Sequence, residues 1–363
     1  MVLTSGFSSY NSNSRSSSYL PETEVPSPPH DTVSELQFAT INQQGTFLLS
    51  TSWDGKVSIW QVQSQGNLSA TLKIQKSPEE QNPMPLLGGC WYSEDNSKVF
   101  LASADNKIKA IDLATQQCVV VGSHDKAVQK CHFFKSSSFV GLISTSLDKS
   151  VKFWDLRQQN PVNVLNLPER IYCSDVSDTM AVFGTSGSSV HFYSFGSQMK
   201  EEGVENLRTV GFDHLSGIKI IKNSSNTCHG YIACCNEGKV RARGTNPDFK
   251  YNYSAHREQH PPANIDDVYS INCLAIHPIH RTLLTGSSDG TFKVIDYEKK
   301  QLIMTSPKPR EYYPITSSDI SQQGDVLAIA KGYDWSKGYE NYLDSCKPKI
   351  VLISCYNAMQ RKS

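Results

Sequence analysis

The sequence predicts an all-β chain folded as a seven-bladed β-propeller that is closed by an N-terminal strand. Three observations favour this fold: a turn-and-strand unit recurs, its strands alternate apolar and polar residues, and no stretch keeps a helical period. The unit reads TSWDGKVSIWQV at residues 51–62 and returns as TSLDKSVKFWDL at 145–156. One such sheet cannot bury both of its faces, so neighbouring sheets must stack, and closing the ring protects the sheet edges.

The spacing of the copies sets the number of blades. Aligned on the turn Asp, copies stand at Asp54, Asp105, Asp148 and Asp289. The first two intervals are 51 and 43 residues, close to the ~40 to 50 residues of a four-stranded blade, and the last interval of 141 residues holds about three blades. Two degenerate copies, FGTSGSSVHFYSF and ACCNEGKVRARGT, fill that interval, and a last copy runs from GDVLAIAKGYDW to KIVLISC. The count is seven.

The turn Asp and the third-strand Trp are expected to have structural roles. The Asp side chain organises the turn, and the Trp ring fills the space between adjacent sheets. In the third unit, His124, Asp148 and Trp154 are expected to form the hydrogen-bonded set typical of WD repeats, together with either Ser144 or Ser146. The residues expected to be structural are His124, Asp54, Trp60, Asp148, Trp154 and Asp289.

The chain divides into a tail, a propeller and a second tail. Residues 1–18 are rich in Ser and Asn and lack the apolar core of a secretory signal, so we expect a disordered tail. Residues 19–356 are expected to form the propeller, and residues 357–363 a C-terminal tail. Because the seventh unit ends without an outer strand, residues 19–25 are expected to supply that strand and to join the two ends of the ring.

Composition limits the function classes. With 35 basic and 35 acidic residues the formal net charge is zero, which gives no global attraction to nucleic acid or to an anionic membrane. The aliphatic run VVV at 119–121 is far below the ~20 apolar residues of a membrane helix, so we expect a soluble chain without membrane insertion. The ten Cys residues lack paired metal-ligand spacing and suggest buried thiols in a reducing compartment. We therefore expect neither a metal nor a cofactor.

Five stretches carry a more specific resemblance: SWDGKVSIWQVQ at 52–63, VKFWDLRQQNPV at 151–162, LPERIYCSD at 167–175, VYSINCLAIHP at 268–278 and GYDWSKG at 332–338. Together they resemble the messenger-RNA export factors of the nuclear pore, WD-repeat propellers related to the mitotic checkpoint propeller. The resemblance implies a non-enzymatic scaffold that binds a hairpin-forming nucleoporin segment and supports export of poly(A) RNA. It also implies a location in the nucleus and at the nuclear pore complex and nuclear envelope, with shuttling to the cytoplasm.

Basic and aromatic residues gather on loops that should share one face of the propeller. These loops are the turns between second and third strands and the links from each outer strand to the next blade. Aromatic rings and Arg are enriched at interface hot spots, and Arg can pair with carboxylates through forked hydrogen bonds. An acidic and apolar partner segment is therefore expected. The loop residues are Trp53, His124, Lys126, Arg170, Tyr172, Arg257, Arg310, Tyr312, Tyr313, Tyr333, Trp335 and Lys337.

The fifth unit has a row of cations. Lys239, Arg241 and Arg243 stand two apart in EGKVRARG and so lie on one face of a strand. Arg243 aligns with the third-strand Trp of other units, and a guanidinium there needs an anionic or carbonyl partner, either inside the protein or on a binding partner. The family resemblance implies that Lys239, Arg243, His256 and Arg257 contact the nucleoporin segment. The expected partner-binding set is Trp53, Arg170, Tyr172, Lys239, Arg243, His256, Arg257, Tyr333, Trp335 and Lys337.

Other function classes have weaker sequence support. The chain has no His-Glu-x-x-His, no Gly-x-Ser-x-Gly and no Gly-rich phosphate loop, so we expect no enzyme. RNA binding is expected to be weak or indirect because the net charge is zero. Two alternatives remain: a checkpoint propeller that binds the same kind of segment in checkpoint kinases, and a substrate receptor of a cullin-type ubiquitin ligase. The latter would attach through FWDLR, with Trp154, Asp155 and Arg157, which a structural turn pairing would also explain. We expect a monomeric propeller within a larger complex.

Overall fold

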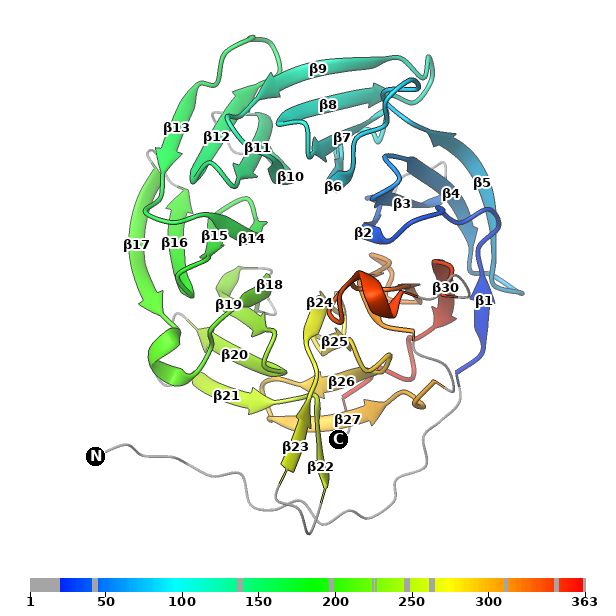
Figure 1. Cartoon of the computed structure of the whole chain (residues 1–363), viewed down its shortest axis with the longest axis vertical. Helices are drawn as coiled ribbons and strands as arrows, with labels where there is room; N and C mark the ends of the chain where they lie inside the picture. Colours follow the sequence, from blue (N-terminus) through cyan, green and yellow to red (C-terminus); the bar gives the residue numbers. More distant parts are fainter. Residues whose placement is uncertain are drawn as a thin grey trace.

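The computed structural model describes residues 20–40, 45–135, 140–195, 199–223, 225, 227–244, 249–260, 265–309, 313–342 and 346–361. In this part of the chain, seven four-stranded antiparallel sheets stand around a central axis (Figure 1). The predicted seven-bladed propeller is therefore confirmed. Tyr19, Arg310 and Tyr312, as well as the predicted N-terminal tail at 1–18, lie outside the described residues.

Each blade runs from an inner strand at the axis to an outer strand at the rim (Figure 1). Blade 1 contains β2 (Val33–Phe38), β3 (Thr46–Ser52), β4 (Val57–Gln63) and β5 (Ser69–Lys76). Blade 2 contains β6 (Leu86–Trp91), β7 (Lys98–Ser103), β8 (Lys107–Asp112) and β9 (Cys118–Ser123). Blade 3 contains β10 (Val128–Lys135), β11 (Val140–Ser146), β12 (Ser150–Asp155) and β13 (Asn163–Asn166). Blade 4 contains β14 (Ile171–Val176), β15 (Met180–Thr185), β16 (Ser189–Phe195) and β17 (Met199–Asn206).

The remaining blades carry the additions that break the regular pattern. Blade 5 contains β18 (Leu215–Lys222), β19 (Cys228–Cys235), β20 (Lys239–Gly244) and β21 (Lys250–Ser254), and it is preceded by the 3-10 helix η1 (Arg208–Val210). A two-stranded hairpin, β22 (Arg257–His260) and β23 (Ile265–Val268), follows. Blade 6 contains β24 (Ile271–Ile276), β25 (Leu283–Ser287), β26 (Phe292–Asp296) and β27 (Gln301–Thr305). Blade 7 contains β28 (Ile315–Ile320), β29 (Val326–Lys331) and β30 (Lys349–Ser354), with the 3-10 helix η2 (Tyr339–Asn341) between β29 and β30.

The outer strand of blade 7 comes from the other end of the chain. β1 (Glu22–Glu24) pairs antiparallel with β30, so that Thr23 lies opposite Leu352. The Val25 amide continues the pairing by donating to the Ile350 carbonyl at 3.0 Å. Val25 is buried, and Lys331 forms an ion pair with Glu22 at 2.6 Å. The predicted closure by an N-terminal strand is therefore confirmed, and it joins the two ends of the ring.

The core consists of apolar layers between neighbouring blades. One layer packs Trp60 of blade 1 against Ala328 and Leu352 of blade 7. Another packs Trp154 of blade 3 against Phe100 and other residues of blade 2. Both Trp rings fill the space between sheets, because a ring of this size covers the twist between two stacked blades.

The C-terminal segment, expected as a tail from 357 to 363, packs on the propeller as far as it is described. Met359 is buried in the layer between blades 6 and 7. Thr282 Oγ1 donates to the Met359 carbonyl at 2.9 Å, and Arg361 Nε donates to the His280 carbonyl at 2.8 Å. The apolar Met and the long Arg therefore hold residues 357–361 against blade 6.

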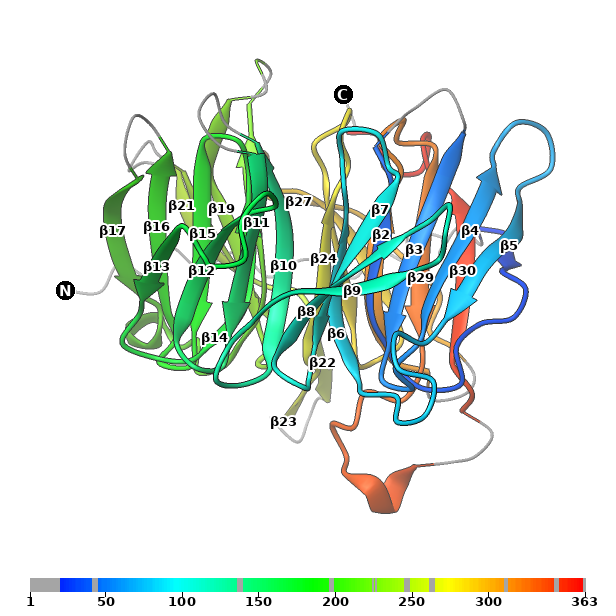
Figure 2. The ribbon, with the colours of Figure 1, turned by 90° about the horizontal axis from the view of Figure 1, so that it is seen from above.

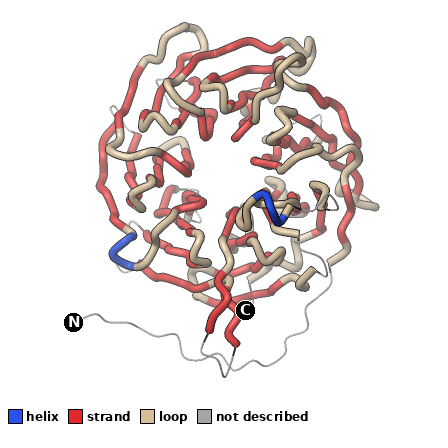
Figure 3. The backbone as a smooth tube through the Cα atoms, in the orientation of Figure 1, coloured by secondary structure: helices blue, strands red, loops and turns tan. Residues whose placement is uncertain are grey.

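The two faces of the ring differ in the segments that project from them. The β22–β23 hairpin and the excursion 332–348, which contains η2 and is described at 332–342 and 346–348, both project beyond the blades on the same side of the disc (Figure 2). The tube view shows that the 3-10 helices are single short turns and that the hairpin points outward from the ring (Figure 3). We call the side with the hairpin and the excursion the loop face. Among the described residues, no helix is long and apolar enough to span a membrane.

Candidate partner-binding surface

Aromatic side chains form a compact cluster on the excursion 332–348. The Trp335 ring stacks on Tyr342 with 5.5 Å between centroids and an interplanar angle of 2°. Tyr333 meets both of these rings edge-on, at 5.3 Å and 5.7 Å. Trp335 remains 45% exposed and Tyr342 38% exposed, whereas Tyr333 is buried and forms the base of the cluster. The cluster thus presents two ordered, partly exposed rings to the solvent.

Thr32 anchors the excursion to blade 1. Its hydroxyl donates to the Tyr333 carbonyl at 2.9 Å and accepts from Trp335 Nε1 at 3.3 Å. The Thr32 carbonyl accepts from the Trp53 amide at 2.9 Å. Trp53 therefore lies next to the same anchor, with its side chain 48% exposed. The structure thus brings together three of the predicted residues, Trp53, Tyr333 and Trp335, although they are far apart in the sequence.

The predicted cations of the loop face are spread over several blades. Arg170 is exposed in the link before β14, and Tyr172 near it is 37% exposed. Arg257 begins the β22–β23 hairpin and lies 3.4 Å from the carboxylate of Asp266. Lys337 is exposed on the excursion. Arg side chains and aromatic rings on rigid turns suit an acidic and apolar partner.

Lys239 lies at the start of β20 and is half-buried. Its ammonium donates to the Gly211 carbonyl at 2.6 Å and stands 6.0 Å from the centre of the Phe212 ring. One internal hydrogen bond leaves two further N–H groups of the ammonium for other acceptors. Lys239 therefore has a structural contact and still belongs to the surface.

His256 has a structural position. Its ring is buried, with Nδ1 3.2 Å from Asp289 Oδ2 and Nε2 2.9 Å from Thr285 Oγ1. Burial lowers the pKa of His256 because a cation is costly away from water, although the nearby carboxylate opposes this effect. Neither His256 nor the equally buried Tyr333 offers a side-chain surface to a partner, in contrast to the sequence-based expectation.

Blade 3 contains a similar buried His that is paired with the turn Asp. Trp154 Nε1 donates to Ser144 Oγ at 2.8 Å, Ser144 lies 2.7 Å from His124 Nε2, and His124 Nδ1 lies 3.0 Å from Asp148 Oδ2. The serine of this set is Ser144, whereas Ser146 donates to main-chain carbonyls. Burial would raise the pKa of Asp148, but hydrogen bonds, first from Ser150, outweigh it and lower the pKa to about 2.

In blade 1, which has no such His, the turn residue has other partners. The Asp54 carboxylate accepts from the amides of His30 and Lys56, each at 3.0 Å. Trp60 is fully buried and donates from Nε1 to the Pro26 carbonyl at 2.8 Å. The turn Asp and the Trp therefore also tie the segment after β1 to blade 1.

Arg243 has an internal counter-ion that the sequence did not reveal. Its Nη1 lies 2.9 Å from Glu205 Oε2, and its guanidinium lies over Phe192 at 5.1 Å. Arg241 is buried and reaches the other oxygen of Glu205 at 2.6 Å, and the Tyr231 hydroxyl also donates to this carboxylate. Burial would raise the pKa of Glu205, but the hydrogen bonds from Tyr231 and the Arg residues lower it to about 2. Of the two readings open for Arg243, the structure shows the internal ion pair.

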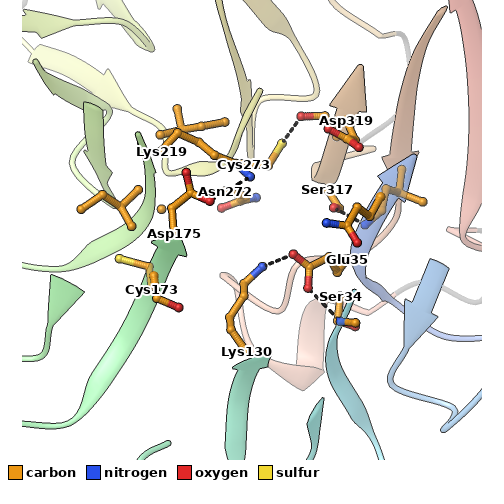
Figure 4. Close-up of a pocket in the computed structure, with 18 of the residues that line it drawn as sticks. Ser34, Glu35, Lys130, Cys173, Asp175, Lys219, Asn272, Cys273, Ser317 and Asp319 are labelled. Carbon is orange, nitrogen blue, oxygen red and sulfur yellow. Dashed lines mark hydrogen bonds and ion pairs between the residues drawn. The ribbon is translucent and has the colours of Figure 1, made fainter. Parts of the chain in front are cut away.

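Charged residues also line the central channel (Figure 4). A cavity of about 280 Å³ lies between the inner strands, and Lys130 forms an ion pair with Glu35 across it. Lys219 lies 3.8 Å from Asp175, and this attraction raises the pKa of Lys219. These carboxylates also accept main-chain amides of the next blade: the Gly89 amide donates to Glu35 at 3.0 Å. The channel groups thus connect neighbouring inner strands.

One group of potential metal ligands occurs among the described residues. The ligand atoms of Glu258, His260 and Asp267 on the β22–β23 hairpin lie within 4.8 Å of one another. His260 is hydrogen-bonded to Asp267 at 2.8 Å, and Glu258 is paired with Lys308 at 2.8 Å. All three ligands are exposed and already have protein partners, so the group is consistent with an ordinary ion-pair network on the hairpin.

The FWDLR segment ends on the face opposite the loop face, at the far end of β12. Arg157 donates from Nε to Asp155 at 2.8 Å, and its side chain is 83% exposed. This is the turn pairing considered from the sequence, and it leaves much of the guanidinium accessible.

Sequence reasoning missed several residues of the surface. Tyr342 belongs to the aromatic cluster, and Tyr339 on η2, three residues before it, is 78% exposed. Their density in the long insertion between β29 and β30 was the available signal. Thr32 carried no signal, because its role as an anchor depends on residues about 300 positions away. Glu205 could not be identified either, because it lies in the preceding blade.

The fold and its internal contacts define a class. Seven blades and two His–Asp pairs beneath the turns are the features of a WD-repeat β-propeller, and one face of this propeller has aromatic and basic loops. The family described as WD domain, G-beta repeat matches residues 27–61, 115–155 and 264–296.

Relatives that align with most of the chain assign it to a particular family of WD-repeat proteins. The chain is 36% identical to Protein Rae1 of Drosophila melanogaster over 93% of its own length and 95% of the relative. It is 34% identical to the mRNA export factor of Macaca fascicularis over 91% of its length and 88% of that protein, and 30% identical to the mRNA export factor rae-1 of Caenorhabditis elegans over 92% and 88%. The chain belongs to the Rae1 family of mRNA export factors.

Proposed function

We propose that this protein acts in mRNA export as a non-enzymatic scaffold of the nuclear pore that binds a hairpin-forming nucleoporin segment on its loop face. The observation that carries the proposal is the ordered aromatic cluster on the excursion 332–348, which lies next to Trp53 and on the same face as the β22–β23 hairpin that begins with Arg257. Arg170 belongs to the same set of loops, because its carbonyl accepts from the Ser186 amide in the turn between β15 and β16. The names of the relatives support the export role. Nuclear location with shuttling to the cytoplasm follows from this role, and RNA contact is weak or indirect in it.

The exposed residues of the surface have two different roles in the proposal, apolar contact and attraction of carboxylates. Trp53, Trp335 and Tyr172 offer apolar area, whereas Arg170, Lys239, Arg257 and Lys337 attract carboxylates of the partner. A partner segment with Asp or Glu beside apolar residues satisfies both groups. His256 acts indirectly, because its buried ring pairs with the turn residue Asp289 beneath the loop face, whereas the guanidinium of Arg243 is engaged by Glu205 inside the protein.

Charge reversal tests the assignment. Arg170→Glu, Lys239→Glu and Arg257→Glu are each expected to weaken capture of a nucleoporin hairpin segment by about tenfold, which corresponds to ~1.4 kcal/mol. Lys73→Glu is the matched control, because Lys73 is exposed on the outer strand β5, away from the loops. Thermal unfolding of Arg170→Glu and Arg257→Glu should match that of the unchanged protein, whereas Lys239→Glu also loses the hydrogen bond to the Gly211 carbonyl and is expected to unfold at a somewhat lower temperature. Unchanged capture by all three loop-face variants would remove the site.

Two other functions have the same fold. A checkpoint propeller would use the same surface for a segment of a checkpoint kinase, and affinity purification from cells with identification of the main partner distinguishes the two. A ligase receptor would use the opposite face, where the exposed Arg157 favours the idea. Co-purification of a ligase adaptor that is lost in Arg157→Ala, while the nucleoporin segment is still captured, would support the ligase role.

A further inference from the structure

The outer strand of blade 2, β9, differs from the other outer strands in its exposed apolar edge. Val119 and Val120 are each 58% exposed, and β9 contains no charged residue. Proteins usually protect a free strand edge with charges, a short length or a cover. Other outer strands show this protection: β5 has Lys73 and Lys76, and β17 has two exposed Glu.

The remaining outer strands are also protected. β21 has Lys250, and β1 has two Glu in a strand of three residues. β27 is uncharged, but its apolar side chains are buried or half-buried. β13 is uncharged and exposed, but it has only four residues. β9, with six residues, is the long, uncharged and exposed edge among the described strands.

β9 is well anchored on its inner side. It pairs with β8, so that Val120 lies opposite Lys109. At the other end, Gly122 packs under the Trp154 ring so tightly that an added Cβ would lie 2.3 Å from it, and Lys152 donates to the Ser123 carbonyl at 2.9 Å. The outer edge of β9 has no strand partner in the described part of the chain. A rigid strand with a free edge is ready to accept another strand at little entropic cost.

A groove borders the beginning of this strand. It has a volume of about 600 Å³ and is lined by residues 76–82 and Cys118. Lys76 is engaged with the Gln116 carbonyl at 2.7 Å, and Glu79 is paired with Lys109 at 3.0 Å. Glu80 is exposed and has no ion-pair partner among the described residues. The groove therefore offers one available carboxylate at the Cys118 end of β9.

We propose that β9 is a second docking site, where an extended peptide of a partner protein adds antiparallel to the free edge. Main-chain hydrogen bonds to the edge give affinity, and Val119 and Val120, which point to opposite faces of the strand, select apolar side chains on both faces of the added strand. Because the added strand is antiparallel, its C-terminal end lies at Cys118, so a basic residue there meets Glu80. The partner segment is thus apolar and β-branched with a basic C-terminal residue, unlike the acidic segment proposed for the loop face.

The test uses the full chain and an eight-residue probe in which Val and Thr alternate and Arg stands at the C-terminal end, measured by fluorescence anisotropy. Val120→Lys is expected to weaken binding by at least about tenfold, because it places a charge on the apolar edge. Val204→Lys is the matched control, since Val204 is a 49% exposed valine on the outer strand β17. A probe methylated at alternate main-chain nitrogens should not bind, because it cannot complete the ladder.

Charge exchange tests the orientation. Glu80→Lys is expected to reverse the preference, so that a probe ending in Glu binds better than the probe ending in Arg. Absence of probe binding at millimolar concentration, or equal binding by Val120→Lys, would overturn the proposal. So would sedimentation showing a dimer of the unchanged protein that dissociates in Val120→Lys, because the edge would then be occupied by a second copy. None of these outcomes depends on capture of the nucleoporin segment.

Discussion

Glu205 shows how a single residue determines the role of its neighbours. The carboxylate lies between blades 4 and 5 and receives Arg241 and Arg243 on its two oxygens. Arg243 stands where other blades place a Trp, so the ion pair and the Phe192 contact replace an aromatic layer. Arg241 is 4% exposed, which makes the pairing obligatory, because an unpaired buried guanidinium is costly.

Glu205→Gln is therefore expected to destabilise the protein by about 3 kcal/mol, since it leaves Arg241 buried without a counter-charge. The free energy of unfolding from urea titration measures the effect. Glu201→Gln is the matched control in the same strand, because the Glu201 side chain is 49% exposed. A loss below about 1 kcal/mol would show that water or other groups solvate Arg241.

The pKa of Asp319 is shifted in the direction opposite to that of Glu205. It accepts the Phe38 amide at 2.7 Å across the boundary between blades 7 and 1. Burial in the channel raises its pKa to about 6, although the nearby Lys219 opposes the shift. A carboxyl whose pKa is raised by folding binds protons more tightly in the folded state. Its contribution to stability therefore falls as the pH rises from about 4 through 6.

Asp319→Asn keeps an oxygen for the Phe38 amide and removes the charge. The variant is expected to be more stable than the unchanged protein at about pH 7.5, by ~3 kcal/mol at most, and the gap should shrink below pH 6 and nearly close by about pH 4. Chemical denaturation at several pH values measures this difference. A gap that is independent of pH would show that Asp319 does not titrate in this range.

Among the elements, the excursion 332–348 contributes most to the proposed binding surface, because it contains the aromatic cluster. It leaves blade 7, is fixed to blade 1 through Thr32, and reaches blade 6 through Asp334, whose carboxylate accepts from Ser288 at 2.5 Å. Three blades therefore hold its aromatic cluster in place. A binding element held in this way loses little entropy when a partner is bound.

Trp335→Ala is expected to weaken capture of the nucleoporin segment by about tenfold or more, because it removes the stack on Tyr342 and an exposed hot-spot ring. Isothermal titration with the segment measures the loss. Leu156→Ala is the control, since Leu156 is 38% exposed on the opposite face. If Trp335→Ala binds normally while its thermal unfolding is unchanged, the aromatic cluster is not part of the site.

At the scale of the whole molecule, stability depends on joining the two ends of the chain. β1 supplies the fourth strand of blade 7, Val25 enters the core layer between blades 7 and 1, and the Pro26 carbonyl accepts from Trp60. Without these contacts the last blade has an open edge and the Trp60 indole loses its partner. The ring is a cooperative structure because each blade is packed on both sides.

A truncation that begins at residue 30 is therefore expected to lower the Tm by roughly 5 to 15 °C, because it removes β1 and Val25. Differential scanning calorimetry measures the shift. A truncation that begins at residue 20 is the control and should leave the Tm unchanged. Equal stability of the two truncated proteins would mean that the ring is closed without β1.

The repeated turn-and-strand unit predicted the fold well, but it predicted the candidate site only in part. The count of blades and the closing strand followed from the spacing of the turn Asp residues and from the missing outer strand. Trp53 and Trp335 were identified from loop position, and both are exposed. His256 and Tyr333 come from equally polar or aromatic loops, but they point inward. The loop position of a residue in the sequence does not determine whether its side chain points toward solvent or into the protein.

The sequence by itself determined the architecture, because periodic turns and alternating apolar residues are local properties that repeat in every blade. The tertiary structure decided which residues are available to partners. The buried carboxylate next to Arg243, the threonine that joins Trp53 to Trp335 and the free edge of β9 each depend on segments that meet only when the ring closes. The burial of a side chain and its pairing with a counter-charge depend on contacts between distant parts of the chain. The closed ring therefore determines them, and a single repeat does not.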